Sequence, residues 1–406
     1  MAENITKLKR ELEENQKKHH CGKETQLSLV AVSYLPKDCV FNTIVRLPLE
    51  SIHASMFVCK IWYGIVNSPS FIHAHLKRSD TGLVFLTPVR NCLPSAKTIF
   101  SVESKVSELL SLPVHQWPLI DPPRLYYMKF IEIKDGKSTV KEYNTSCMGN
   151  IRATCNGLII LEHHTKSGGL VLMNTVTREL KPIPLGTRSS PHQESYGLAF
   201  CHVLGVYKLV HLFLDKLRYV ECEIMDIGNG SWRWRAVDGP AFGVFGWLGY
   251  QPVFTIGALH WIPNIDVNEY MVSLALDDEK FVKTPLPSSC GIHDRIIEMS
   301  CFLGFVTRQD TDRIIVWILR SLSDGVWEQQ YTISVESSWQ SMVPLYCKGI
   351  YGEIIFRCKD DDLYVYDYCL QLVRKVEDEK QRSLPLANHC YPHVNSLISW
   401  KIKAEE

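Results

Sequence analysis

A short all-helical module followed by a large, mainly-β region is the fold class that this sequence predicts. Between residues 35 and 76, apolar side chains recur at the three- and four-residue spacing of amphipathic helices. From residue 81 onward, short runs of β-branched and aromatic residues alternate with glycine, proline and polar turns. Many of these runs come in pairs joined by a short polar connection, which is typical of β-hairpins.

Three short helices and a final turn are expected in the helical module. Pro36 stands where a first helical position is expected, because proline lacks the N–H that is unpaired there in any case. Val40 and Ile44 recur on one face of this helix, and Pro48 ends it. Further helices are expected over residues 49–57 and 59–66, with a last turn from residue 71. About 40 residues seldom bury a sufficient core alone, so another protein or the rest of the chain should cover one apolar face.

The residues of this module closely resemble the F-box. The resemblance rests on LPxD before an apolar helix, then RLP, a second apolar helix and a V-x-K-x-W pattern, all within residues 35–62. In that family, the apolar positions and prolines dock onto a Skp-type adaptor, which links to a cullin ubiquitin-ligase scaffold. The resemblance therefore implies that nine residues contact the adaptor or pack the helices on each other, two roles that the pattern does not separate: Leu35, Pro36, Val40, Ile44, Leu47, Pro48, Ile52, Val58 and Trp62.

Composition restricts the classes of protein to consider. The chain has 406 residues, 46% of them hydrophobic and 22% charged, with a formal net charge of zero, as in ordinary globular proteins. A nucleic-acid-binding protein should show a basic excess, so no nucleic-acid partner is expected. No run of 18 apolar residues occurs, so no membrane-spanning helix is expected. The 14 scattered cysteines form no CxxC pair and follow a charged N-terminus, which indicates a reducing compartment, cytoplasmic or nuclear.

Four segments are expected along the chain. They are a polar leader over residues 1–30, disordered or a short helix, the helical module over 31–78, a β domain over 79–400, and a tail over 401–406. Asp135-Gly136, between strand-like runs, predicts a tight hairpin turn. Repeated hairpins throughout the β domain favour radial repetition of small sheets, as in a β-propeller. A sandwich of stacked sheets is the alternative architecture.

The β domain also resembles the F-box-associated domains of plants. The resemblance is carried by segments such as CNGLIIL from Cys155, YGLAFCHVLGVYKLV from Tyr196 and FTIGALHWI from Phe254. Domains of that family are propeller-like and recruit substrates. The resemblance therefore implies that the β domain holds an unknown target protein.

No catalytic residue, metal site or cofactor is predicted. The chain has no phosphate-binding glycine loop, HExxH helix or GxSxG elbow. His163-His164 is interpreted as part of a solvated loop, Asp360–Asp362 as a hairpin tip, and His260 as a structural residue. Aromatic residues are dense between Trp232 and Trp261, where core packing is the usual role. An irregular stretch within this region is the best candidate for a recognition loop that contacts the target, through Phe242, Phe245, Trp247 and Tyr250.

These observations predict the substrate-recognition subunit of a Skp–cullin–F-box (SCF) ubiquitin ligase. The helical module would hold the adaptor and the β domain would hold the target, so that the protein catalyses no reaction itself. Two alternatives remain open. One is an F-box scaffold that acts outside degradation, and the other is a propeller-type binding protein, lectin or enzyme.

Overall fold

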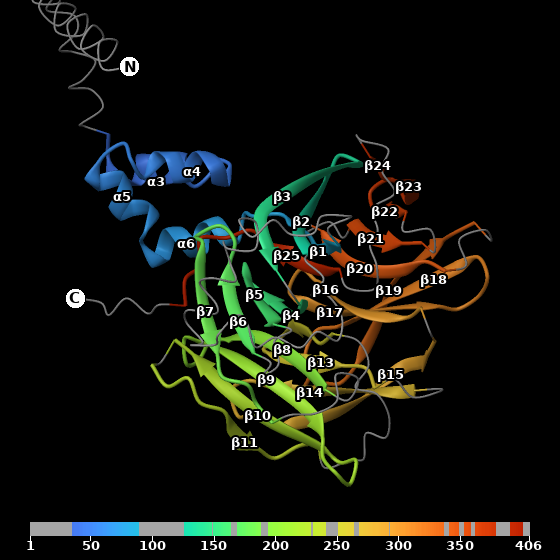
Figure 1. The fold of residues 1–406 in the computed structure, drawn as a ribbon. Coiled ribbons are helices and arrows are strands. Elements are labelled where there is room, and N and C mark those ends of the chain that lie inside the picture. Colours follow the sequence, from blue (N-terminus) through green and yellow to red (C-terminus); the bar gives the residue numbers. More distant parts are fainter. Residues whose placement is uncertain are drawn as a thin grey trace, which may run out of the picture. The chain divides into compact units, whose positions relative to one another are not determined.

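The structure is a computed structural model with two compact units (Figure 1). The helical unit lies within Met1–Arg78 and the β unit within Ser79–Glu406. The structure describes residues 35–88, 126–147, 149–163, 169–187, 194–228, 230–240, 251–263, 268–291, 293–336, 341–348, 353–358, 362–378 and 390–400.

Four short helices form the described part of the helical unit. Pro36 and Pro48 are N-caps with extended backbones, so each stands one position before its helix rather than inside it. The expected last turn is a complete helix, in which the Ser68 hydroxyl accepts a hydrogen bond from the Phe71 N–H (3.3 Å). The four helices are α3 (Lys37–Ile44), α4 (Leu49–Ser55), α5 (Lys60–Val66) and α6 (Pro69–Leu76).

The helical unit has a small apolar core. Helix α5 packs against α3, α4 and α6. Ile44, Ile52 and Phe71 have no exposed surface, and the rings of Phe41 and Phe71 meet edge to face at 5.3 Å. Burial of these side chains supplies the main stabilisation of helices this short, which are marginal alone in water.

The β unit is a six-bladed β-propeller, which confirms the propeller prediction and excludes the stacked-sheet sandwich. Its six sheets comprise five of four strands and one of five. Blades 1 to 3 contain β4 (Gly149–Cys155), β5 (Leu158–His163), β6 (Leu170–Asn174) and β7 (Glu179–Ile183); β8 (Glu194–Cys201), β9 (Val206–Leu214), β10 (Val220–Ile227) and β11 (Arg235–Val237); and β12 (Val253–Thr255), β13 (Ala258–Trp261), β14 (Asn268–Ala275) and β15 (Phe281–Cys290).

The remaining blades complete the ring. Blades 4 to 6 contain β16 (Arg295–Met299), β17 (Phe302–Arg308), β18 (Arg313–Leu319) and β19 (Trp327–Ser334); β20 (Val343–Lys348), β21 (Glu353–Arg357), β22 (Leu363–Asp367) and β23 (Leu372–Lys375); and β25 (Tyr391–Val394), β1 (Thr81–Pro88), β2 (Tyr126–Lys134), β3 (Lys137–Cys147) and β24 (Glu377–Asp378).

Blade 6 closes the ring with strands from both ends of the β unit. Strand β25 pairs antiparallel with β1, with Val394 opposite Thr81. The two-residue strand β24 pairs in parallel with β3, and the Glu377 N–H donates to the Gly136 carbonyl (2.9 Å). The ring is therefore fastened at an inner strand and at an outer strand, which removes a free junction between the first and last blades.

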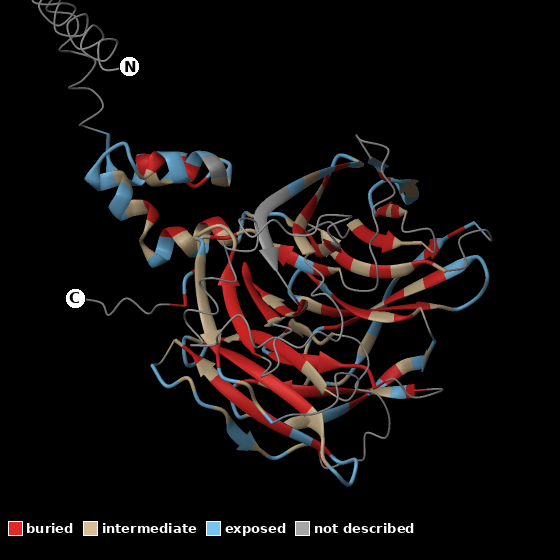
Figure 2. Ribbon diagram, in the orientation of Figure 1, coloured by how far each residue is buried: buried red, intermediate tan, exposed pale blue. Residues whose placement is uncertain are grey.

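Most blades are buried on both faces, because each blade packs between two neighbours (Figure 2). All five residues of β6 are buried, and the first four are apolar, so this strand shows no alternation of apolar and polar residues. Apolar clusters lie between blades; one joins Met128 of blade 6 to Ile159 of blade 1. At the predicted hairpin turn between β2 and β3, Asp135 and Gly136 both have positive φ (51° and 76°), as a type I′ turn requires.

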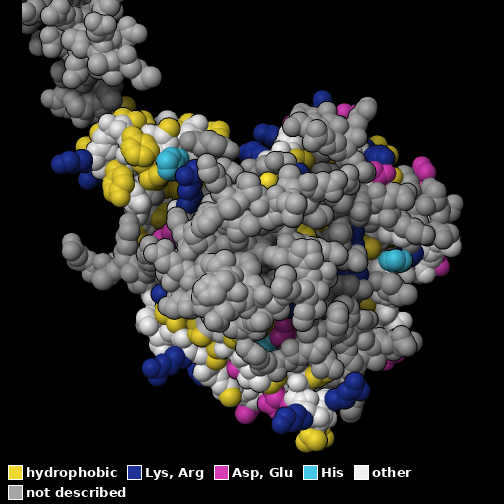
Figure 3. Space-filling view, in the orientation of Figure 1, with side chains coloured by type: hydrophobic (Ala, Val, Ile, Leu, Met, Phe, Trp, Pro, Cys, Tyr) yellow, Lys and Arg dark blue, Asp and Glu magenta, His cyan; other side chains and the backbone are white. Residues whose placement is uncertain are grey.

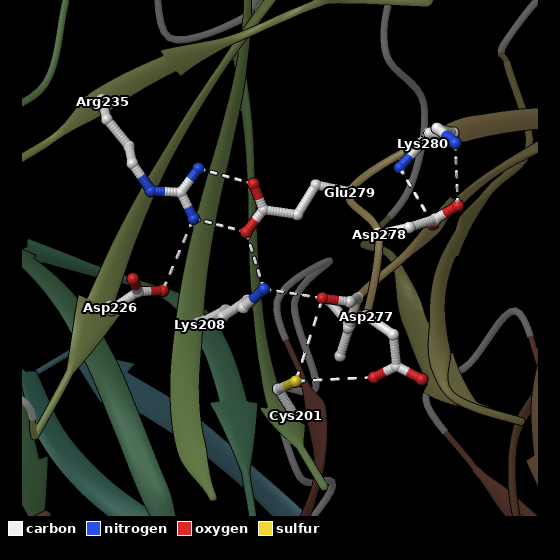
Figure 4. A network of polar contacts seen from close by, with 9 residues as sticks. Cys201, Lys208, Asp226, Arg235, Asp277, Asp278, Glu279 and Lys280 are labelled. Carbon is white, nitrogen blue, oxygen red and sulfur yellow. Dashed lines mark hydrogen bonds and ion pairs between the residues drawn. The ribbon is translucent and has the colours of Figure 1, made fainter. Parts of the chain in front are cut away.

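A charged network joins blades 2 and 3 (Figure 4). The Lys208 ammonium, in β9, is only 1% exposed and donates to the Leu276 carbonyl and to Glu279 Oε1, each at 2.6 Å. Arg235 of β11 binds both carboxylate oxygens of Glu279, with Nη1 2.5 Å from Oε2. The hydrogen bonds from Arg235, together with Lys208, lower the pKa of Glu279 to about 2, although burial opposes the shift.

Candidate functional site

The nine residues expected to serve adaptor binding divide by exposure. Val40, Ile44 and Ile52 are buried, so in this structure they pack the helices on each other. Leu47 and Trp62 are half-buried. The remaining four are exposed and available for contact with another protein: Leu35, Pro36, Pro48 and Val58. The structure thus separates the buried positions of this pattern from the exposed ones.

An exposed apolar segment follows α4 and continues into α5. Phe57 is 79% exposed and Val58 60% exposed, and Ile61 and Tyr63 are also exposed. Figure 3 shows apolar side chains gathered on the surface of the helical unit. We call Phe57, Val58, Ile61 and Tyr63 the apolar segment. Adjacent exposed apolar residues of this kind mark interaction sites more often than single ones do.

The turn between α4 and α5 holds the apolar segment outward. Helix α4 ends at Ser55 rather than near residue 57. In the turn that follows, the Phe57 N–H donates to the Ala54 carbonyl and the Val58 N–H donates to the Ser55 carbonyl, each at 3.2 Å. Cys59 is extended (φ −163°), so the chain changes direction before α5. Helical spacing does not place Phe57 on the apolar face of α4, and the apolar triplet from Met56 to Val58 is the sequence signal for this segment.

Only part of the sequence-based interpretation of the β domain can be placed. The proposed recognition residues Phe242, Phe245, Trp247 and Tyr250 lie outside the described residues. Trp261 is 2% exposed, and its Nε1 donates to the Ser195 hydroxyl at 3.0 Å, which confirms core packing at that position.

His260 is confirmed as structural. Its ring nitrogens lie 2.8 Å from the Ser273 hydroxyl and 3.1 Å from the Thr255 carbonyl, with no exposed surface. Burial lowers the pKa of His260 to about 4, so the imidazole is neutral.

The described ranges contain neither a metal-binding group of side chains nor a membrane-spanning helix. No group of three or more His, Cys, Asp or Glu side chains there is placed to hold a metal ion. Within the same ranges, no helix has the length and apolarity needed to cross a bilayer. His163 ends strand β5, whereas His164, Asp360 and Asp361 fall outside the described residues. Asp362 pairs with Lys375 at 2.5 Å.

The match to a known family lies in the helical unit, and the similar proteins cover most of the chain. Residues 32–74 match the model of the F-box domain. F-box protein At3g07870 of Arabidopsis thaliana is 23% identical over 415 residues, covering 90% of this chain and 92% of the relative. Putative F-box/kelch-repeat protein At1g62270 of the same plant is 23% identical over 326 residues, covering 74% of this chain and 78% of the relative.

Among solved structures, TolB from Acinetobacter baumannii is similar with a TM-score of 0.42 and 9% identity, and the likeness covers 79% of this chain and 70% of TolB.

The family match shows that residues 32–74 are an F-box domain. The relatives of this chain in Arabidopsis thaliana include proteins named as F-box proteins.

Proposed function

We propose that this protein is the substrate-recognition subunit of an SCF-type E3 ubiquitin ligase. The F-box domain binds a Skp-type adaptor and, through it, a cullin scaffold, while the propeller binds a target protein. The protein itself catalyses no reaction. We further propose that the propeller is a domain of the plant F-box-associated type, and that the nine F-box positions serve the adaptor contact directly or through helix packing.

The exposed apolar segment carries this proposal. Four large apolar side chains without cover within the helical unit supply the kind of surface that a partner buries at the centre of an interface. Val58 belongs to the F-box pattern, and Phe57, Ile61 and Tyr63 extend the same surface. A helical unit whose apolar side chains were all buried would offer an adaptor no such contact.

Tethering is the mechanism that this arrangement supports. A protein that holds the adaptor with one unit and the target with another raises the effective concentration of target lysines near the ubiquitin-conjugating enzyme. Such a role needs binding surfaces rather than reactive groups. The free cysteines among the described residues support a cytoplasmic or nuclear location, where thiols stay reduced.

Assembly with purified adaptor and cullin tests the proposal. We expect the full chain to co-elute with both in size-exclusion chromatography, and Val58→Asp to lose this co-elution. Val203→Asp is the matched control, because Val203 is 71% exposed in the turn between β8 and β9 of the propeller. Failure of the unaltered chain to co-elute with the adaptor, or equal behaviour of the two variants, would contradict the proposal.

A further inference from the structure

A charged cluster joins blade 1 to blade 2 around the imidazole of His211. In blade 1, Arg152 Nη2 lies 2.6 Å from Glu162 Oε2 and 2.9 Å from Glu194 Oε1, the latter at the start of blade 2. Glu194 Oε2 lies 3.2 Å from His211 Nε2, and His211 Nδ1 lies 2.8 Å from Glu223 Oε1. The side chain of His211 has no exposed surface. One imidazole therefore holds two carboxylates, and one of them reaches across to the next blade.

The partners of both carboxylates determine the protonation state of His211. Glu223 Oε1 accepts from the Thr187 backbone N–H (2.7 Å), and Glu194 accepts from the guanidinium of Arg152. An amide N–H and a guanidinium can only donate, so the oxygens that face them, Glu223 Oε1 and Glu194 Oε1, act as acceptors. A neutral imidazole has a single N–H, whereas two ionised carboxylates facing its two nitrogens require two. The geometry thus fits the imidazolium form, which donates from both ring nitrogens.

The surroundings of His211 contain no other source of a hydrogen bond to its ring among the described residues. The ring of Tyr196 stacks on it at 4.2 Å and 5°, and the rings of Phe213 and Trp234 lie 5.1 and 5.9 Å away. The charged and titratable groups that face the ring directly are Glu194 from β8, Glu223 from β10 and Tyr196 from β8. Arg152 of β4 and Glu162 of β5 lie behind Glu194.

We propose that His211 is a proton-controlled latch between blades 1 and 2. In its imidazolium form it holds Glu194, and through Glu194 the guanidinium of Arg152. Its Nδ1–H donates to Glu223, which also accepts from the Thr187 N–H, and its Nε2–H donates to Glu194, so the two contacts depend on different protons of one ring. When a base takes the Nε2 proton into solvent, the Nε2 lone pair faces the Glu194 carboxylate and this contact is lost. Nε2 loses its proton first because its contact is longer than that of Nδ1.

The direction of the pH dependence follows from the partners. Burial alone would lower the pKa of His211, but the hydrogen bonds and charges of Glu194 and Glu223 raise it above its ordinary value of 6.5. A raised histidine pKa gives a stabilisation that is complete below the unfolded-state pKa and is lost as the pH rises through the folded-state pKa. The latch is therefore closed at low pH and opens as the pH rises through the raised pKa of His211.

Histidine titration in the full chain tests the latch. With ¹³C-labelled histidine, we expect the His211 resonance, assigned by its absence in His211→Gln, to titrate above pH 6.5. Over the same pH range, the thermal midpoint of the unaltered chain should fall, and hydrogen-exchange protection near Glu194 should decrease. Glu223→Gln replaces one carboxylate by an amide, so the His211 titration should move to lower pH in this variant.

The control is His260→Gln, which removes another buried imidazole. His260 has a lowered pKa and is neutral at these pH values, so its replacement should leave the alkaline fall in thermal midpoint unchanged. A His211 titration at or below pH 6.5 would overturn the proposal, as would an unchanged titration in Glu223→Gln. If Glu223→Gln does not fold, the titration of the unaltered chain still decides the question.

Discussion

Replacing Glu279 by alanine tests how firmly the charged network of Figure 4 joins blades 2 and 3. In the folded protein, the Lys208 ammonium is 1% exposed and has two partners, the Glu279 carboxylate and the Leu276 carbonyl. Glu279→Ala leaves Lys208 with the neutral carbonyl alone. A buried cation that loses its counter-ion keeps its desolvation cost without the compensating attraction.

Glu279→Ala should lower the free energy of unfolding by a large amount for the loss of one partly exposed carboxylate. Removing one partner of a buried ion pair costs about 3–5 kcal/mol. The other pair of Glu279 adds little, about 0–1 kcal/mol, because Arg235 is 42% exposed and screened by water. Since Glu279 itself keeps some contact with solvent, we expect the lower end of the range, about 3 kcal/mol.

Urea unfolding followed by tryptophan fluorescence measures this loss. Adding Lys208→Met to Glu279→Ala should restore part of the stability, because the buried charge is then replaced by an apolar side chain of similar length. The matched control is Arg313→Ala, which breaks the half-exposed Arg313–Asp310 pair (2.6 Å) and should cost less than about 1 kcal/mol. The reasoning is refuted if Glu279→Ala costs no more than Arg313→Ala, or if the double variant is no more stable than Glu279→Ala.

Three further predictions concern packing, closure and acid stability. Ile44→Ala should destabilise the helical unit by about 2–4 kcal/mol because it opens a cavity at a fully buried site, seen as an earlier loss of helical circular dichroism on heating. Asn174→Ala should increase hydrogen exchange near Ser396 and Ile398, because the buried Asn174 amide donates to both of their carbonyls (3.1 and 2.8 Å). Because the pKa of Glu279 is lowered to about 2, its contribution should be present above pH 4.5 and disappear as the pH falls towards 2, and Glu279→Gln should flatten urea midpoints in that range.

Local patterns predicted the elements whose partners are close in sequence. Helical spacing placed α3 and α5, and the Asp135-Gly136 turn placed the β2–β3 hairpin, since both depend on residues within a few positions. Boundaries were less accurate. Helix α4 ends at Ser55, before the expected residue 57, so Phe57 lies in the turn that follows the helix.

Contacts between distant residues were beyond the reach of sequence patterns. Nothing local to β25 indicates that it pairs with β1, about 300 residues earlier, or that β24 adds to β3. Strands buried on both faces lose the alternation that would show which side meets which blade, as β6 illustrates. The cluster at His211 was missed for the same reason, because its groups come from five strands of two blades.

The exposure of the F-box positions needed the structure too. Val40 and Val58 fit the same sequence pattern, yet one is buried and the other is 60% exposed. Apolar spacing identifies a helix face but does not show whether that face meets another helix or remains uncovered. Mutagenesis aimed at partner binding should therefore use Val58 rather than Val40, whose replacement would also disturb the helix core.

The affinity of the full chain for a purified Skp-type adaptor, measured by titration calorimetry, tests the central claim most directly. Because Val58 offers an uncovered apolar contact, we predict measurable binding by the unaltered chain and by Val203→Asp, with affinity at least about 30-fold weaker for Val58→Asp, as expected for a central interface residue. No binding by the unaltered chain, or equal affinity of Val58→Asp and Val203→Asp, would contradict the account.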